Sequence, residues 1–214
     1  MEHIVYVVLL VLAIAGAIYI RMKERREVVR LARERDAIEI EERRMFNFLH
    51  GLGETLQEDH SPANMHRYIV EGVAEVIGGD AGVLYLLDGE SGELVPVYQS
   101  VTTAPVLPEP AGIGEIEDEV EAESQYRSFI KLSALKKDDL FIGRVMTGKK
   151  QIYIPDLAEH ADFKNDGIRF QKNVCLVAAP LVYARKQVGV LIVTRKGGGQ
   201  FSLNDQEVFS SVAE

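Results

Sequence analysis

A single cysteine and a few scattered histidines are the side chains best able to do chemistry in this sequence. Cys175 lies in the apolar run VCLVAAPL. It could be a redox or metal sensor, but a small thiol in such a run is more often an inert core side chain. One thiol can form neither an intrachain disulfide nor a cysteine-rich zinc site. Four histidines lack the mutual spacing that seats zinc or haem: His50, His60, His66 and His160. The sequence therefore predicts no metal centre and no thiol catalysis.

Two other segments resemble ligand sites only in composition. Seven acidic residues and no basic one lie between Glu109 and Glu123. They could hold a cation, but a run of carboxylates in a helix and the loop before it usually forms a solvated face. The triplet at residues 197–199 is all glycine, yet it lacks the Lys-Ser/Thr pair of a phosphate-binding loop. We interpret it as an ordinary connection.

The charge distribution argues against a nucleic-acid partner. The net charge of the chain is −9. Residues 21–58 carry nine basic and nine acidic side chains, whereas residues 59–214 carry fifteen basic and twenty-three acidic ones. The globular part is thus acidic and has no sustained basic stripe to neutralise phosphates.

Residues 4–20 are predicted to form a transmembrane helix. The segment IVYVVLLVLAIAGAIYI is uncharged and barely long enough for a single span. Arg21, Lys23, Arg25 and Arg26 follow it, so the positive-inside rule places the rest of the chain in the cytoplasm. A cleaved signal peptide is the alternative, but its positive charge would precede the apolar run. We expect an uncleaved single-pass anchor in the inner (cell) membrane.

The charged segment 21–44 is predicted to be a helical linker continuous with the span. It contains neither Pro nor Gly and is rich in good helix formers. One apolar position repeats every seven residues, as in a coiled coil, at Leu31, Ile38, Met45 and Leu52. The second apolar position that a coiled coil needs in each heptad is interrupted by charged residues. A dimerising coiled coil is favoured over an inert helical spacer. Such a helix could carry a change of rotation or register between membrane and cytosolic domain.

Residues 45–214 read as a single α+β domain. The pattern predicts a helix from Pro62 to the glycines at 78–79, and a hairpin formed by residues 81–88 and 93–99 with Pro96 marking an edge strand. Helices are expected at 114–131 and 141–146, and a short strand at 151–154. Two apolar strands follow at 174–181 and 188–194, and a last helix is capped by Ser202 with Asp205 in its first turn.

In this order and spacing the segments resemble the GAF domain family. The resemblance rests on AGVLYLLD and ELVPVYQS in the first hairpin, on FIGRVMTGKKQIYIPDL at 141–157, and on NVCLVAAPLVYARKQVGVLIVTRKGGGQFSLNDQEVF at 173–209. It implies an antiparallel sheet flanked by helices on both faces. It also implies a small-molecule pocket between the sheet and the irregular segments near residues 100–170.

The resemblance does not identify a ligand or a cofactor, because GAF pockets bind varied molecules. The Asn-Lys-Phe motif of cyclic-nucleotide-binding members is missing, since Lys164-Asn165-Asp166 has the wrong pattern. Bilin-binding members place a cysteine in a helix beside the pocket, whereas Cys175 opens a predicted strand. Free methionine sulfoxide reductases of this family need more than one cysteine. We therefore expect no catalytic activity from this chain.

Five side chains are candidates to meet a ligand at such a pocket: Tyr98, Phe141, Arg144, Tyr153 and Asp156. The aromatic ones could line the pocket or fill the core. The two charged ones could meet a polar ligand, although a structural pair between Arg144 and Asp156 is favoured.

These features together predict a membrane-anchored, cytoplasm-facing sensory module that forms a homodimer through its linker and domain helices. A small molecule or a partner would act on the domain, and its helices would transmit the change. The alternative is a ligand-free GAF domain that serves as a dimerisation scaffold at the membrane. The last helix in such proteins often leads into a PP2C-type phosphatase, a histidine kinase or a diguanylate cyclase, so we expect this chain to be a fragment of a longer protein.

Overall fold

A computed structural model describes residues 35, 39–40, 42–54, 61–163 and 170–213 of the chain. It divides the chain into two units, Met1–Phe46 and Asn47–Glu214. The described residues of the first unit are helical, and residues 47–54 of the second are helical as well. The second unit holds the sheet and all the elements described below.

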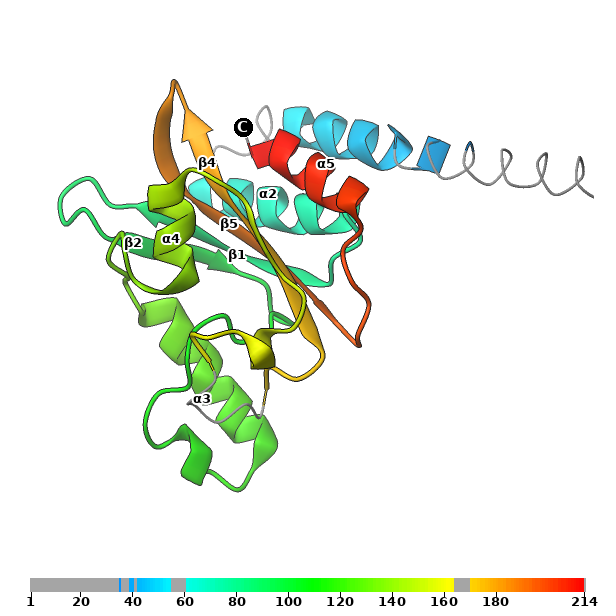
Figure 1. The fold of residues 1–214 in the computed structure, drawn as a ribbon. Helices are drawn as coiled ribbons and strands as arrows, with labels where there is room; N and C mark the ends of the chain where they lie inside the picture. The colour runs from blue at the N-terminus through cyan, green and yellow to red at the C-terminus, as the bar shows by residue number, and fades with distance from the viewer. Residues whose placement is uncertain (1–34, 36–38, 41, 55–60, 164–169, 214) are drawn as a thin grey trace, which may run out of the picture. The chain divides into compact units, whose positions relative to one another are not determined.

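Five antiparallel strands form one sheet in the order β2-β1-β5-β4-β3 (Figure 1). The strands are β1 (Ala81–Leu87), β2 (Leu94–Gln99), β3 (Ile152–Ile154), β4 (Val174–Tyr183) and β5 (Lys186–Lys196). The apolar runs of β1, β4 and β5 are buried because they occupy the middle of the sheet. Pro96 lies in an edge strand, where its missing N–H disrupts no central ladder.

One face of the sheet carries α2 (Pro62–Val76) and α5 (Leu203–Ala213). Helix α2 contacts β1, β2 and β5, and α5 contacts β4 (Figure 1). The backbone of β1 approaches α2 closely at Gly82, where an added Cβ would lie 2.8 Å from a methyl carbon of Val70 and 2.6 Å from the carbonyl oxygen of Ile192. A side chain there would therefore push the helix away from the sheet.

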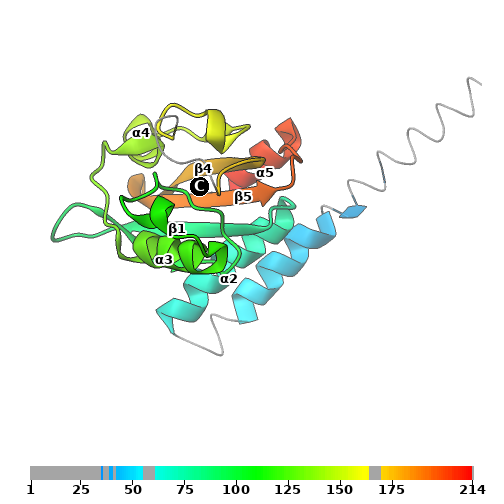
Figure 2. The same cartoon turned by 90° about the horizontal axis from the view of Figure 1, so that it is seen from below.

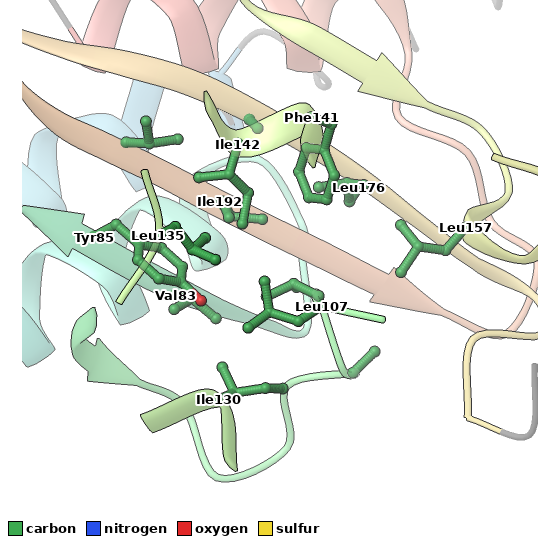
Figure 3. Packing of buried hydrophobic residues seen from close by; sticks show 14 of the residues in the cluster. Val83, Tyr85, Leu107, Ile130, Leu135, Phe141, Ile142, Leu157, Leu176 and Ile192 are labelled. Carbon is green, nitrogen blue, oxygen red and sulfur yellow. The ribbon is translucent and has the colours of Figure 1, made fainter. Parts of the chain in front are cut away.

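The other face is covered by α3 (Glu119–Leu132), α4 (Leu140–Gly148) and the short 3-10 turns η1 (Ile113–Glu115) and η2 (Leu157–Glu159) (Figure 2). Asp118 caps α3, because its carboxylate accepts the backbone N–H groups of Val120 and Glu121 at 2.9 and 3.0 Å. The main hydrophobic core fills the space between this layer and the sheet (Figure 3). It contains side chains from β1, β4 and β5 and from the covering elements, among them Val83, Leu107, Ile130, Phe141, Leu176 and Ile192.

The structure confirms the predicted α+β fold with an antiparallel sheet between helices. The last helix begins as expected: the Ser202 hydroxyl accepts the Asp205 N–H at 3.1 Å, and the Asp205 carboxylate accepts the Ser202 N–H at 2.8 Å. One boundary differs. The helix expected from residue 114 starts at Glu119, because Asp118 caps it and the preceding acidic residues form η1 and a short extended link.

Two of the N-terminal predictions fall wholly or largely outside the residues that the structure describes. The span predicted at residues 4–20 lies outside the described residues, as does most of the linker predicted at 21–44; the described linker residues 35, 39–40 and 42–44 are helical. Within the part of the chain that is described, no helix has the length and apolarity needed to cross a membrane. The predicted coiled-coil pairing therefore stays a prediction.

Candidate functional site

Tyr85 places a hydroxyl group inside the hydrophobic core. Its side chain extends from β1 toward the α3 and α4 layer and is fully buried; Figure 3 shows its oxygen pointing into the cluster. The hydroxyl has no hydrogen-bond partner in the structure. Burial raises the pKa of the Tyr85 hydroxyl far above its ordinary value, so the group stays protonated and able to donate. A buried hydroxyl without a partner costs about 1–3 kcal/mol, which marks this position as unusual.

Gln99 adds a primary amide on the same face of the sheet. It pairs across the ladder with Val83, whose side chain belongs to the core, so the Gln99 side chain points the same way. Tyr85 lies two residues further along β1 and is its diagonal neighbour. Only 7% of Gln99 is exposed, and both its amide nitrogen and its amide oxygen are buried without a partner.

A β-bulge decides that Gln99, and not its neighbour, faces the core. The register of β1 with β2 runs from Leu87 opposite Leu94 to Tyr85 opposite Pro96, and then shifts, so that Val83 lies opposite Gln99. One extra residue in β2 reverses which side chains point to each face. Without the shift, Tyr98 would point into the core in place of Gln99.

A third set of buried polar groups comes from the covering layer. The Tyr126 hydroxyl of α3 donates to the carbonyl oxygen of Leu107 at 2.5 Å and accepts from the Gln171 amide nitrogen at 2.9 Å. Gln171 is 1% exposed, and its amide oxygen is buried without a partner. These bonds hold Tyr126 and Gln171 in place, and the Gln171 amide oxygen remains a buried acceptor without a donor.

We call Tyr85, Gln99 and Gln171 the interior polar set. Each belongs to the buried face between the sheet and the α3 layer, and each has at least one unpaired polar atom. All three side chains are uncharged, and none of the described residues that are buried carries a charge. Because polar groups are seldom left unpaired in a core, the set is the best candidate for a ligand-contacting site.

The aromatic residues proposed from sequence are divided between the two faces. Phe141 is fully buried in the core on the α4 side. Tyr98 faces α2, where its hydroxyl donates to the Glu71 carboxylate at 2.6 Å; partial burial, together with this bond and the negative charge, raises the pKa of Tyr98 to about 12. Tyr153 packs edge-on against Phe201, which precedes α5, with ring centres 6.5 Å apart. The structure therefore does not bring these three aromatic rings together.

The charged pair expected between Arg144 and Asp156 does not form. Arg144 pairs with Asp162 through two nitrogen–oxygen contacts of 2.9 and 3.2 Å. Asp156 caps η2 by accepting the N–H of Ala158 at 3.0 Å. Short-range capping occupies Asp156, and the segment after η2 brings Asp162 to the guanidinium. A ligand contact by Arg144 or Asp156 stays a prediction.

His160 lies beside this ion pair. Its Nδ1 accepts the Asp162 N–H at 3.4 Å, and it lies 3.7 Å from the Asp162 carboxylate, which would favour a charged ring. Burial nevertheless lowers the pKa of His160, because the ring also packs against Phe141 and Phe163. We assign a neutral ring that accepts the backbone N–H.

Cys175 is a buried residue on the α5 side of the sheet. Its thiol donates to the carbonyl oxygen of Gly199 at 3.0 Å, and burial raises the pKa of the Cys175 thiol. A protonated, hydrogen-bonded thiol fits the structural role that the sequence favoured. Across the described residues, no cluster of three or more His, Cys, Asp or Glu side chains could hold a metal ion.

Arg195 of β5 joins the sheet to both helices of the α2 and α5 face. Its guanidinium donates to the carbonyl oxygens of Ile77, Gly78 and Gln200 at 2.7–2.9 Å. It also lies 3.6 Å from the Asp205 carboxylate. The end of α2 and the start of α5 are therefore tied to one side chain.

The interior polar set was missed by reasoning from the sequence. Tyr85 and Gln99 lie in strands whose apolar character predicts core or edge positions, and Gln171 precedes a strand without any motif. The one available signal was a polar or amphipathic residue at an inward position of a strand. At Gln99 the strict alternation of a strand would give the opposite orientation, because the bulge in β2 cannot be seen in the sequence.

Comparisons with known proteins agree on the fold. A model of the GAF domain family matches residues 59–214, and the search of curated proteins found no match. The GAF domain of a phosphoenolpyruvate-protein phosphotransferase from Coxiella burnetii is 15% identical with a TM-score of 0.56, over 79% of this chain and 88% of that chain. The A. aeolicus nlh2 GAF domain in an inactive state is 16% identical with a TM-score of 0.57, over 81% and 93%.

An enzyme of the same fold is also similar. Free methionine-R-sulfoxide reductase from Neisseria meningitidis, solved with its substrate, is 14% identical with a TM-score of 0.51, over 76% of this chain and 79% of that chain. At these identities the likeness shows the fold and does not transfer an activity.

Proposed function

Because this chain belongs to the GAF domain family, a family of ligand-binding sensory and regulatory domains, we propose that it is a signal-sensing module that binds a small molecule at the interior polar set. The observation that carries the proposal is the buried Tyr85 hydroxyl, which has no partner although it is enclosed by the core. A ligand that supplied the missing hydrogen bonds would bind and stabilise the domain.

Transmission would run through the helices on the opposite face. Arg195 ties the end of α2 and the start of α5 to β5, whose Ile192 belongs to the core that surrounds Tyr85. The helical residues 47–54 pack on α2, because the Phe48 ring stacks on Tyr68 with centres 6.0 Å apart. A ligand that favours one packing of the sheet would shift these helices only if its affinity differs between the two states.

We further propose that residues 4–20 anchor the chain in the inner membrane with the domain in the cytoplasm, and that the protein is a homodimer through its linker and domain helices. The charge asymmetry around residues 4–20 supports the anchor. We also propose that the chain itself is not an enzyme. Its one cysteine is buried and hydrogen-bonded, which supports this assignment.

A broad thermal-shift screen of metabolites and nucleotides tests the sensor proposal. Bound compounds should raise the unfolding temperature by mass action, and native mass spectrometry of gently extracted protein should find a bound species. No shift across the panel and no bound species would support the alternative, a ligand-free dimerisation scaffold. The observation that favours this alternative is the burial of the interior polar set, which leaves little of it accessible from solvent.

A further inference from the structure

Residues 47–54 attach to α2 through two reciprocal contacts. The Phe48 ring lies over Gly72, where an added Cβ would overlap the ring carbon Cδ2 and lie 2.8 Å from Cε2. The Tyr68 side chain lies over Gly51, where an added Cβ would overlap the hydroxyl oxygen and lie 2.7 Å from the ring carbon Cζ. Each helix therefore places an aromatic ring on a glycine of the other.

These contacts make the two helices antiparallel, because residue numbers rise along one helix as they fall along the other (Figure 2). The Phe48 and Tyr68 rings also stack, with centres 6.0 Å apart and planes 12° from parallel. The Tyr68 hydroxyl donates to the Phe48 carbonyl oxygen at 3.3 Å. One pair of aromatic side chains thus joins the segment to α2 through both its rings and its backbone.

The fit exists in only one register along α2. One turn of an α-helix is 3.6 residues. A shift by one turn in one direction would move the Phe48 ring from Gly72 onto Tyr68. A shift in the other direction would move the ring onto Glu75 or Val76. In both cases the ring would meet a side chain at the place where Gly72 has none, so the segment cannot slide along α2 and keep its close contact.

The segment is held by few buried contacts. Phe48 is 7% exposed, whereas Leu49 is 58% exposed and every other residue of 47–54 is exposed or half-buried. Gly51 and Gly53 are poor helix formers, so the helix gains little from its own backbone. A segment with one buried side chain opens at a lower free energy than strands in the middle of a core.

We propose that residues 47–54 form a two-state joint, which is either docked on α2 in this one register or undocked as a unit. In the docked state, a displacement of the segment displaces α2, and in the undocked state the two move independently. The joint therefore controls whether movement of the predicted linker is coupled to the domain. It does not depend on a ligand at the interior polar set, so it goes beyond the proposed function.

Gly72→Ala tests the joint by hydrogen–deuterium exchange of the full chain in detergent. Alanine favours a helix over glycine, so in open space the substitution would strengthen α2. The overlap with the Phe48 ring reverses this sign, and the amides of residues 47–54 should exchange about 10-fold faster or more. Gly53→Ala is the matched control, since nothing lies within 4 Å of its added carbon, and exchange should stay the same or become slower.

A compensating substitution identifies the contact itself. Phe48→Leu removes the ring atoms that the new methyl group would meet, so Phe48→Leu with Gly72→Ala should exchange more slowly than Gly72→Ala alone. Gly51→Ala should have a smaller effect than Gly72→Ala. Its methyl group would meet the hydroxyl end of Tyr68, which can turn aside, whereas the Phe48 ring is buried.

Three outcomes decide the proposal. Faster exchange of residues 47–54 in Gly72→Ala, with β1 and β5 as in the unmodified protein, supports the joint. Unchanged or slower exchange of residues 47–54 would overturn it, because the Phe48 ring would then not rest on Gly72. Equal acceleration of residues 47–54, β1 and β5 would also overturn it, because the segment would open only with the whole domain. Each outcome is read without a ligand, so the sensor proposal stands or falls separately on its own screen.

Discussion

The guanidinium carbon of Arg195 lies 4.2 Å from the centre of the Phe201 ring. The same guanidinium donates to backbone carbonyl oxygens at the end of α2 and before the start of α5. A planar group with several fixed donors can make these bonds while stacking on an aromatic ring, which an ammonium group cannot do. Arg195 therefore fixes the segment from which α5 leaves the sheet.

Arg195→Lys should lower the free energy of unfolding by about 1–3 kcal/mol, because at least two of the three carbonyl bonds and the ring contact are lost. Urea denaturation followed by circular dichroism measures the change. Arg185→Lys, on the exposed turn between β4 and β5, is the matched control and should change stability by less than about 0.5 kcal/mol. Equal effects of the two substitutions would refute the role of Arg195.

Gly82→Ala should destabilise the domain by about 1–3 kcal/mol through overpacking. The added methyl would meet both the Ile192 carbonyl oxygen and the Val70 side chain, and the carbonyl belongs to the central strand and cannot move aside. Gly89→Ala is the control, since nothing lies within 4 Å of its added carbon. Comparison of the two midpoints in urea shows whether α2 lies as close to β1 as the structure indicates.

His160 should make the domain less stable in mild acid. Burial lowers the pKa of His160 below its ordinary value of 6.5. A histidine whose pKa is lower in the folded state stabilises the fold above pH 6.5, and this contribution is lost as the pH falls through the folded-state pKa. His160→Gln should therefore flatten the decline of unfolding free energy that sets in as the pH falls below about 6.5 toward the folded-state pKa.

The comparison for that measurement is the unmodified protein titrated over the same pH range. His66, whose pKa is also lowered by burial, should account for part of the slope that remains. A slope identical in the unmodified protein and in His160→Gln would show that the ring is not the titrating group.

Deletion of residues 1–20 should move the protein from the membrane fraction to the soluble fraction, because it removes the uncharged segment long enough to span a bilayer. Carbonate washing and ultracentrifugation of both forms measure the partition. A second variant, Leu10→Arg with Leu12→Arg, keeps the length and should have the same effect, since each arginine costs about 2.5–3.5 kcal/mol at the centre of a span. Retention of both variants in the membrane would contradict the anchor.

The sequence by itself determined the elements and the family. Local signals sufficed for this. Ser202 and Asp205 form the predicted cap, and Pro96 lies in the predicted edge strand. The apolar runs at 174–181 and 188–194 form strands β4 and β5, as predicted. These signals depend on neighbours within a few positions, so they can be read along the chain.

Only the tertiary structure decided which side chains share a face. The bulge in β2 turns Tyr98 toward Glu71 and brings Gln99 into the core beside Tyr85, and the fold joins Arg144 to Asp162 and leaves Asp156 as a cap. A one-residue shift in register reverses every side chain beyond it, and it is set by contacts between strands distant in sequence. The sequence therefore identified the family, whereas the fold located the unpaired polar groups that define its candidate site.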